Sequence, residues 1–235
     1  MNAAALNVIA LNVIAQLVRD RPADAAVYVE GRSGRAVTGA DLAAAVAHWR
    51  PRVAHLGGAP VVAMATADPL EFATTYLGLL AAGARVAPLD PGAPAAAMRQ
   101  DIVELGATAV VVDGDLAPVA GGGHGAGDGG VLLRSSGSTG PRKLIHLSVP
   151  QLVHVGAAVA RAHVLSPEDV GYSPLPLFHV NAQVVGLLST LVAGSTLVLD
   201  RRFSRRRFWP TVAKQQVTWL NAVPAILAIL EHDGD

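Results

Sequence analysis

Between residues 60 and 112 the sequence alternates short apolar strands with helical segments, and this alternation restricts the fold more than any other feature. Each helical segment ends at a glycine, Gly83 or Gly106, and each strand is short and rich in Val and Ala. Strand–helix–strand units of this length are typical of a parallel sheet covered by helices. The predicted order is strand 60–65, helix 70–82, strand 85–89, helix 97–105 and strand 108–112.

The alternation continues on both sides of this region. Thr38 and Asp41 have the spacing of a capping box and predict a helix start, and Pro51 is expected to end or kink that helix. Ser148 and Gln151 repeat the pattern before a helix that reaches about residue 163. We therefore predict an α/β fold of mainly parallel sheets flanked by helices. The remaining expected elements are strands 131–133, 195–199 and 217–220 and helices 208–216 and 224–230.

A glycine-rich segment separates the two halves of the pattern. Seven of the ten residues from 121 to 130 are Gly, which predicts a surface loop with nothing to bury. We accordingly expect a first α/β lobe over residues 1–120, the loop at 121–130, and a second α/β lobe over residues 131–235.

The composition excludes several classes of protein. The chain has no Cys, which rules out a disulfide scaffold, a thiolate zinc site and a Cys nucleophile. Its 18 basic and 18 acidic residues give a formal net charge of zero, which argues against a nucleic-acid-binding protein. The eight His residues show no spacing typical of a metal site.

A long uncharged stretch needs a separate interpretation. Residues 170–199 contain no Asp, Glu, Lys or Arg, but prolines and polar residues interrupt the run. This pattern indicates a loop, a buried helix and a strand rather than a membrane span, which needs roughly twenty apolar residues in sequence. The apolar first residues lack the basic region of a secretory signal, so we expect a cytoplasmic protein.

The motif with the clearest chemical meaning is R-S-S-G-S-T-G-P-R-K at residues 134–143, directly after a predicted strand. Glycines let backbone N–H groups turn toward an anion, hydroxyls donate hydrogen bonds, and Lys143, one of only two lysines, adds a compact positive charge. A Ser/Gly-rich stretch alone is more often an ordinary loop, and the spacing is not that of a P-loop NTPase. The candidate phosphate-binding residues are Ser135, Ser136, Gly137, Ser138, Thr139, Gly140 and Lys143, with Thr139 also a candidate Mg²⁺ ligand.

The context of this motif resembles the adenylate-forming (AMP-binding) superfamily of acyl-CoA synthetases, nonribosomal peptide adenylation domains and luciferases. Residues 135–143 are similar to the family's T-S-G-[ST]-T-G-x-P-K loop, which holds the β and γ phosphates of ATP. Residues 82–91 resemble A-G-A-x-x-V-P-L-[DN]-P, and residues 175–181 resemble L-P-x-F-H-x-x. The resemblance runs from about residue 11 to residue 230, with the motifs in the family's order. It implies the fold of the first half of the large N-terminal domain of acyl-CoA synthetases.

The chain also departs from the family pattern. Arg142 stands where the family has Pro, and Leu144 stands where Gly usually follows the Lys, so we expect weakened binding of ATP. The resemblance further implies an incomplete enzyme, because the chain reaches only about halfway through the family's length. The segments for adenine and ribose, the Y-G-x-T-E motif with its Mg²⁺-binding Glu, and the C-terminal lobe with its catalytic Lys are not in these 235 residues.

His179 is the second candidate for a functional residue. A His beside Phe178 and before an uncharged helix can orient a carboxylate, although a hydrogen-bonded structural His explains the same pattern. The resemblance favours the first interpretation, because the family's His lies beside the acyl substrate. The candidate catalytic residues are therefore His179 and Lys143, and the predicted acid pocket contains Phe178, His179, Asn181 and Gly186.

A cationic run follows the predicted strand at 195–199. Five arginines fall within seven residues, which is compatible with contacts to phosphates of ATP or CoA or to a nucleic-acid backbone. Most runs of this kind are solvated turns, and we interpret this run in the same way. Its members are Arg201, Arg202, Arg205, Arg206 and Arg207.

The family reaction implied by the resemblance joins a carboxylic acid to a thiol in two steps. The acid attacks Mg·ATP to give an acyl-adenylate and pyrophosphate, and a thiol, that of CoA, then displaces AMP. We expect little or no activity from this chain alone. Three alternatives remain: a ligase part that needs a complementary C-terminal polypeptide, a non-catalytic binding or regulatory protein, and a degenerate product. An apolar face near the C-terminal end also predicts a homodimer or a hetero-complex.

Overall fold

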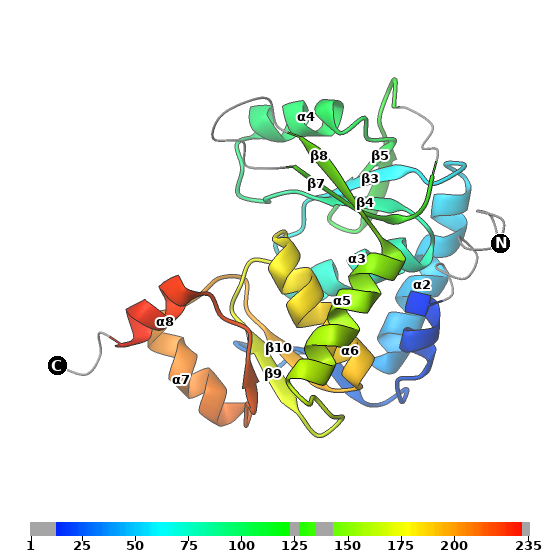
Figure 1. The fold of residues 1–235 in the computed structure, drawn as a ribbon. Coiled ribbons are helices and arrows are strands. Elements are labelled where there is room, and N and C mark those ends of the chain that lie inside the picture. The colour runs from blue at the N-terminus through cyan, green and yellow to red at the C-terminus, as the bar shows by residue number, and fades with distance from the viewer. Residues whose placement is uncertain (1–12, 123–126, 135–142, 232–235) are drawn as a thin grey trace.

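The computed structural model describes residues 13–122, 127–134 and 143–231 (Figure 1). These residues form two sheets, flanked by helices and stacked with helices between them. The predicted α/β class with mainly parallel sheets is confirmed, because six strand pairs are parallel and three are antiparallel.

The six-stranded sheet has the order β6-β5-β3-β4-β7-β8. Its parallel centre is nearly all apolar, and each of its four strands carries residues with no exposed surface, as expected for strands covered on both faces. The antiparallel strands β6 and β8 lie at the two edges. The strands are β3 (Val61–Met64), β4 (Arg85–Pro88), β5 (Ala109–Val112), β6 (Asp115–Pro118), β7 (Gly130–Arg134) and β8 (Leu144–Ser148).

The five-stranded sheet has the order β11-β9-β10-β1-β2. Here β1 and β10 pair in parallel although more than 160 residues separate them in the chain, with Tyr28 opposite Leu197. The antiparallel β2 forms one edge and the two-residue β11 forms the other. The strands are β1 (Ala26–Glu30), β2 (Ala36–Thr38), β9 (Val170–Ser173), β10 (Thr196–Leu199) and β11 (Trp219–Leu220).

The helix α3 (Pro69–Ala81) lies between the sheets, because it contacts β1 of one and β4 of the other. Eleven of its residues are buried, which suits an apolar helix at the centre of the molecule. It crosses α2 (Gly39–Ala54) closely at Gly78, where an added Cβ would lie 2.3 Å from Trp49 Cδ1. The other helices are α4 (Ala95–Glu104), α5 (Val149–Ala162), the π-helix η1 (Ala182–Leu188), α6 (Ser189–Ala193), α7 (Arg205–Lys214) and α8 (Pro224–Glu231).

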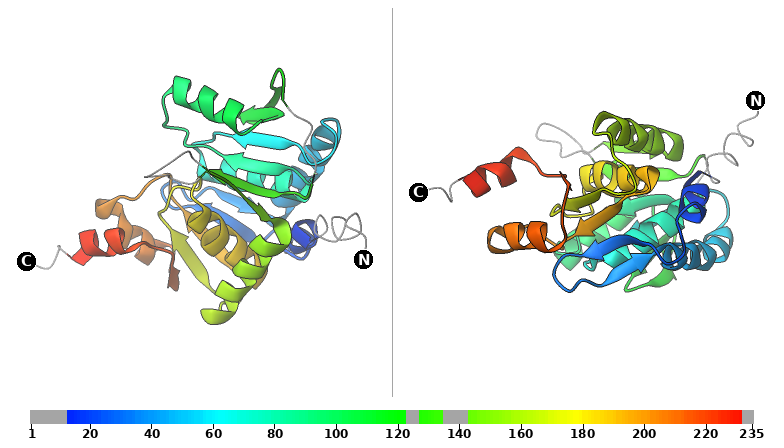
Figure 2. Two further views of the ribbon diagram at one scale, coloured as in Figure 1. Left: turned by 45° about the horizontal axis from the view of Figure 1, so that its top comes forward. Right: turned by 90° about the horizontal axis from the view of Figure 1, so that it is seen from below.

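The helices divide between the ends and faces of the molecule. In the two views of Figure 2, α7 and α8 lie at the end of the molecule opposite α2. The helices α5, η1 and α6 contact one another and, through η1 and α6, the strands β9 and β10. No helix in the described part of the chain is long and apolar enough to cross a membrane.

Most predicted elements are present, with shifts of a few residues. Both capping boxes are found, at Thr38 with Asp41 and at Ser148 with Gln151. Pro51, however, does not end its helix: α2 continues to Ala54, and the buried side chain of Val53 anchors the added turn. Each sheet takes strands from both sides of the glycine-rich segment, and the division into lobes at residues 120 and 131 stays a prediction.

Candidate functional site

The turn that carries His179 lies beside the end of β7, at a cavity of about 410 Å³ between the two sheets. We call this the His179 cavity. Its walls come from the carboxyl ends of β4 and β7, from α4, and from the turn after β9. The lining residues are Ala87, Pro88, Leu89, Asp90, Asp101, Leu105, Leu132, Leu133, Arg134, Phe178, His179 and Val180.

Arg134 closes one side of this cavity. It is the last residue of β7, and its guanidinium forms ion pairs with Asp101 and Glu104 of α4. Its side chain is only 13% exposed and that of Asp101 is 27% exposed, so this pair is shielded from solvent more than an ordinary surface pair, whereas Glu104 is exposed. The two contacts fix α4 to the end of the strand that leads into residue 135.

His179 is exposed, and its ring lies against Phe178 with centroids 4.3 Å apart. Two backbone hydrogen bonds hold the turn: His179 N–H donates to the Pro176 carbonyl at 3.1 Å, and Gln183 N–H donates to the His179 carbonyl at 3.3 Å. The local fold thus presents an imidazole at the cavity edge on a turn stabilised by its own backbone.

Gln183 supports the same turn from below. Its side chain has no exposed surface, and Nε2 donates to the Leu177 carbonyl at 2.9 Å. Its Oε1 is buried without a hydrogen-bond partner in the described part of the chain. The sequence does not reveal this role of Gln183, because nothing in the local pattern shows that its amide reaches back to residue 177.

The helix after His179 begins as a π-helix, η1, which widens the turns around Gly186. Single π-helical turns inside helices occur frequently at functional sites. An added Cβ at Gly186 would lie 3.6 Å from both Asn221 Nδ2 and Ser173 Oγ, and those two groups are buried and 3.4 Å apart. Asn181 is exposed at the start of η1.

The predicted site residues are only partly brought together. Phe178 and His179 line the His179 cavity, while Asn181 and Gly186 are on the helix that follows and are not among its lining residues. Lys143 is exposed, immediately before β8. The other candidate phosphate-binding residues, including the candidate Mg²⁺ ligand Thr139, lie outside the described residues: Ser135, Ser136, Gly137, Ser138, Thr139 and Gly140.

The two ends of the phosphate-loop motif are nevertheless placed. Arg134 and Leu144 are register partners at the end of the antiparallel pair β7–β8. Because Arg134 also lines the His179 cavity, the motif starts at the wall of that cavity. Sequence reasoning did not identify Arg134 and Asp101 as partners, since 33 residues separate them.

Comparisons with known proteins show which enzymes this chain resembles. Residues 125–235 match the family model of the AMP-binding enzymes. Over 103 residues the chain is 42% identical to the sulfoacetate–CoA ligase of Cupriavidus necator, and over 105 residues it is 37% identical to the oxalate–CoA ligase of Arabidopsis thaliana. Each alignment covers 44% of this chain and 20% of the relative.

Solved structures share the fold over nearly the whole chain. ATP-bound MatB from Rhodopseudomonas palustris aligns with a TM-score of 0.79 at 19% identity, over 95% of this chain and 51% of MatB. The N-terminal domain of FACL13 from Mycobacterium tuberculosis aligns with a TM-score of 0.76 at 21% identity, over 96% of this chain and 65% of that domain. The chain therefore spans about half the length of MatB.

Residues 125–235 thus resemble the AMP-binding enzymes in sequence. Over nearly its whole length the chain has the α/β fold of the N-terminal part of acyl-CoA synthetase-like proteins, and about 100 of its residues are similar to CoA ligases.

Proposed function

We propose that this chain is the phosphate-loop and acid-pocket part of an acid–thiol ligase that adenylates a carboxylic acid and transfers the acyl group to CoA. The observation that carries the proposal is the His179 cavity, where the end of β7 and the His179 turn meet. Arg134 is the first residue of the phosphate-loop motif, and residues 178–180 belong to the second motif, so both motifs contribute to one cavity.

The division of labour follows from the chemistry of each residue. Lys143 and the hydroxyl and N–H groups of residues 135–140 would hold the β and γ phosphates of ATP and neutralise the pyrophosphate leaving group. His179 would orient the carboxylate of the acid, and the turn stabilised by Gln183 would keep the imidazole in place. ATP, when bound with Mg²⁺, would supply the adenylyl group that activates the acid, and pyrophosphate would leave.

The acid is proposed to be small. The two relatives described above are named for sulfoacetate and oxalate, which are short acids with a second anionic group. The His179 cavity, at about 410 Å³, lies toward the small end of ligand pockets, which range from about 300 to 1,000 Å³. Phe178 and the apolar ends of β4 and β7 leave little room for a long acyl chain within it.

The complete reaction needs parts that these 235 residues do not contain, whether on the same polypeptide or on another. The chain alone is expected to bind Mg·ATP weakly and to turn over little or not at all. Addition of the C-terminal remainder of a related sulfoacetate–CoA ligase should therefore raise acid-dependent release of pyrophosphate above that of either part alone. Equal release with and without the added part would contradict a split ligase.

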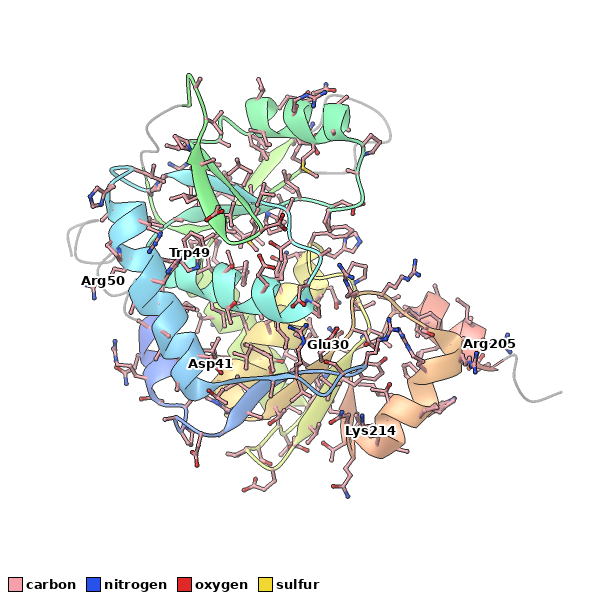
Figure 3. The ribbon with its side chains drawn as sticks, turned by 180° about the vertical axis from the view of Figure 1, so that it is seen from behind. Glu30, Asp41, Trp49, Arg50, Arg205 and Lys214 are labelled. Atoms are coloured by element: carbon pink, nitrogen blue, oxygen red, sulfur yellow. The ribbon has the colours of Figure 1, made fainter. Side chains whose placement is uncertain are left out.

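The phosphate loop is tested by calorimetric titration of the chain with Mg·ATP. Lys143→Ala should weaken binding by about tenfold or more, since a charge-assisted contact to phosphate contributes at least that factor. Lys214→Ala is the matched control, because Lys214 is the only other Lys in the sequence. It lies at the C-terminal end of α7 (Figure 3). An equal loss of affinity for Mg·ATP in both variants would show that ATP binds through nonspecific electrostatic attraction.

The alternative function is a non-catalytic binding protein on the same scaffold. It is favoured by one observation, the departures Arg142 and Leu144 in the phosphate-loop motif. This alternative predicts ATP binding without pyrophosphate release even when the C-terminal part is supplied. The complementation assay therefore separates the two functions.

A further inference from the structure

A second cavity, of about 670 Å³, lies where the carboxyl ends of strands from both sheets converge. Its walls include the loops after β1, β3, β4, β9 and β10, and loops at the carboxyl ends of parallel strands are where α/β proteins bind ligands. We call it the arginine cavity. Its lining residues are Glu30, Arg32, Thr66, Ala67, Pro69, Phe72, Asp90, Pro91, Gly92, Pro176, Leu177, Phe178, Asp200, Arg201, Arg202 and Arg207.

Four arginines from three separate segments face this cavity. Arg32 comes from the turn after β1, Arg201 and Arg202 follow β10, and Arg207 belongs to the first turn of α7. Arg201 Nε donates to the Ala67 carbonyl at 2.8 Å, and this contact ties the loop after β10 to the loop after β3. The cationic run noted in the sequence is thus divided: three members line the cavity, and Arg205 and Arg206 do not.

These four guanidinium groups have no acidic partner at ion-pair distance within the described residues. The ion pairs found there involve Arg35 and Arg134. In addition, Arg207 Nε is buried and makes no hydrogen bond in the described part of the chain. A buried N–H without a partner costs free energy, and an anion in the cavity would supply the acceptor.

Each of the three carboxylates of the cavity accepts a hydrogen bond from a group other than the four arginines. Glu30 accepts from Arg35 at 3.0 Å, the Asp90 carboxylate accepts from Gly92 N–H at 2.8 Å, and the Asp200 carboxylate accepts from the Tyr172 hydroxyl at 2.7 Å. Asp200 is 3% exposed, and burial raises its pKa. The four arginines outnumber these three carboxylates, so the net charge of the lining is positive.

We propose that the arginine cavity binds the phosphate group of a small phosphorylated molecule. Guanidinium groups match phosphate oxygens in pairs, and several arginines converging on one space are suited to a doubly charged oxyanion. Phe72, Leu177 and Phe178 form an apolar wall for the organic part of the ligand. The proposal does not depend on the ligase function, and the arginine cavity shares only Asp90 and Phe178 with the lining of the His179 cavity.

The test is a titration of the isotopically labelled chain with inorganic phosphate, followed by amide chemical shifts in NMR spectra at constant ionic strength. Amides near Arg32 and Arg202 should shift together and saturate. Arg202→Glu should weaken this binding about tenfold or more, because it replaces a charge-assisted contact with repulsion. Arg206→Glu, the matched control, makes the same charge change on an exposed residue outside the cavity and should alter the affinity less than about twofold.

Several results would overturn the proposal. Equal weakening by Arg202→Glu and Arg206→Glu would mean nonspecific attraction, and shifts confined to residues around Lys143 would mean that phosphate binds only at the loop. Arg32→Glu gives an independent check from a different segment. Lys143→Ala should leave the shifts near Arg202 unchanged, so failure of the ATP experiment and failure of this one are distinguishable.

Discussion

The carboxyl of Asp200 should make the stability of the protein depend on pH. Its burial raises its pKa above the ordinary value, and the hydrogen bond from Tyr172 and the charge of Arg207 offset this only in part. The folded chain therefore keeps a proton on Asp200 at pH values where the unfolded chain has lost it. This contribution to the free energy of unfolding is complete below the ordinary pKa and declines as pH rises through the raised pKa.

Asp200→Asn tests this dependence, because the amide still accepts from Tyr172 and cannot ionise. Its free energy of unfolding, relative to the unmodified chain, should increase as pH rises from about 4 to about 7. Urea denaturation at several pH values measures the difference. Asp115→Asn removes an exposed carboxyl and serves as the control. A difference that stays constant with pH would contradict a raised pKa at Asp200.

Single residues differed in how well the sequence predicted them. Thr38 and Ser148 were predictable as helix caps because the residue that completes each box lies three positions away. Arg134 was not predictable as a partner of Asp101, because only the packing of α4 on the sheet brings them together. The same limit applies to Arg32 and Arg202, which approach one cavity from distant parts of the chain.

At the scale of elements, the crossing of α2 and α3 should be sensitive to one added methyl group. Gly78→Ala would place a Cβ 2.3 Å from Trp49 Cδ1 and 3.0 Å from the Ala45 carbonyl, so the two helices must separate. Overpacking of this kind should lower the free energy of unfolding by about 1–3 kcal/mol, measured by urea denaturation. Gly186→Ala is the control within a helix, since its nearest atoms would lie 3.5 Å away. Equal stability of Gly78→Ala and the unmodified chain would refute the close crossing.

Elements with local signals were predictable, and elements defined by pairing were not. Caps, apolar composition and stop signals in the sequence indicate the helices α3, α4 and α5. These helices begin and end within about two residues of the predicted positions. By contrast, β1 and β9 gave no comparable signal. β9 lies in the uncharged stretch that was interpreted as a loop, and its strand form depends on parallel pairing with β10 and β11. The π-helix η1 likewise has no marker in the sequence.

At the scale of the whole molecule, the carboxyl ends of both sheets face a common region, and this arrangement explains why two cavities lie side by side. The His179 cavity uses the ends of β4 and β7, and the arginine cavity uses the ends of β1, β3, β4, β9 and β10. The motifs of the adenylate-forming class could be recognised in the sequence because they are contiguous. Their meeting at one cavity could not, because β7 belongs to one sheet and the turn that carries His179 follows β9 of the other.

The end of the molecule formed by α7, β11 and α8 should promote association between copies of this chain. Trp209, Leu220, Leu227 and Ile229 there are 37% to 54% exposed, and β11 is the last strand of its sheet in the described part of the chain. Exposed apolar residues beside an open sheet edge favour contact with a second copy.

Light scattering over a dilution series should show a concentration-dependent dimer. The double change Leu227→Lys with Ile229→Lys should shift it to monomer, while Val103→Lys, a charge added to an exposed residue of α4, should not. A monomer at every concentration would contradict the association.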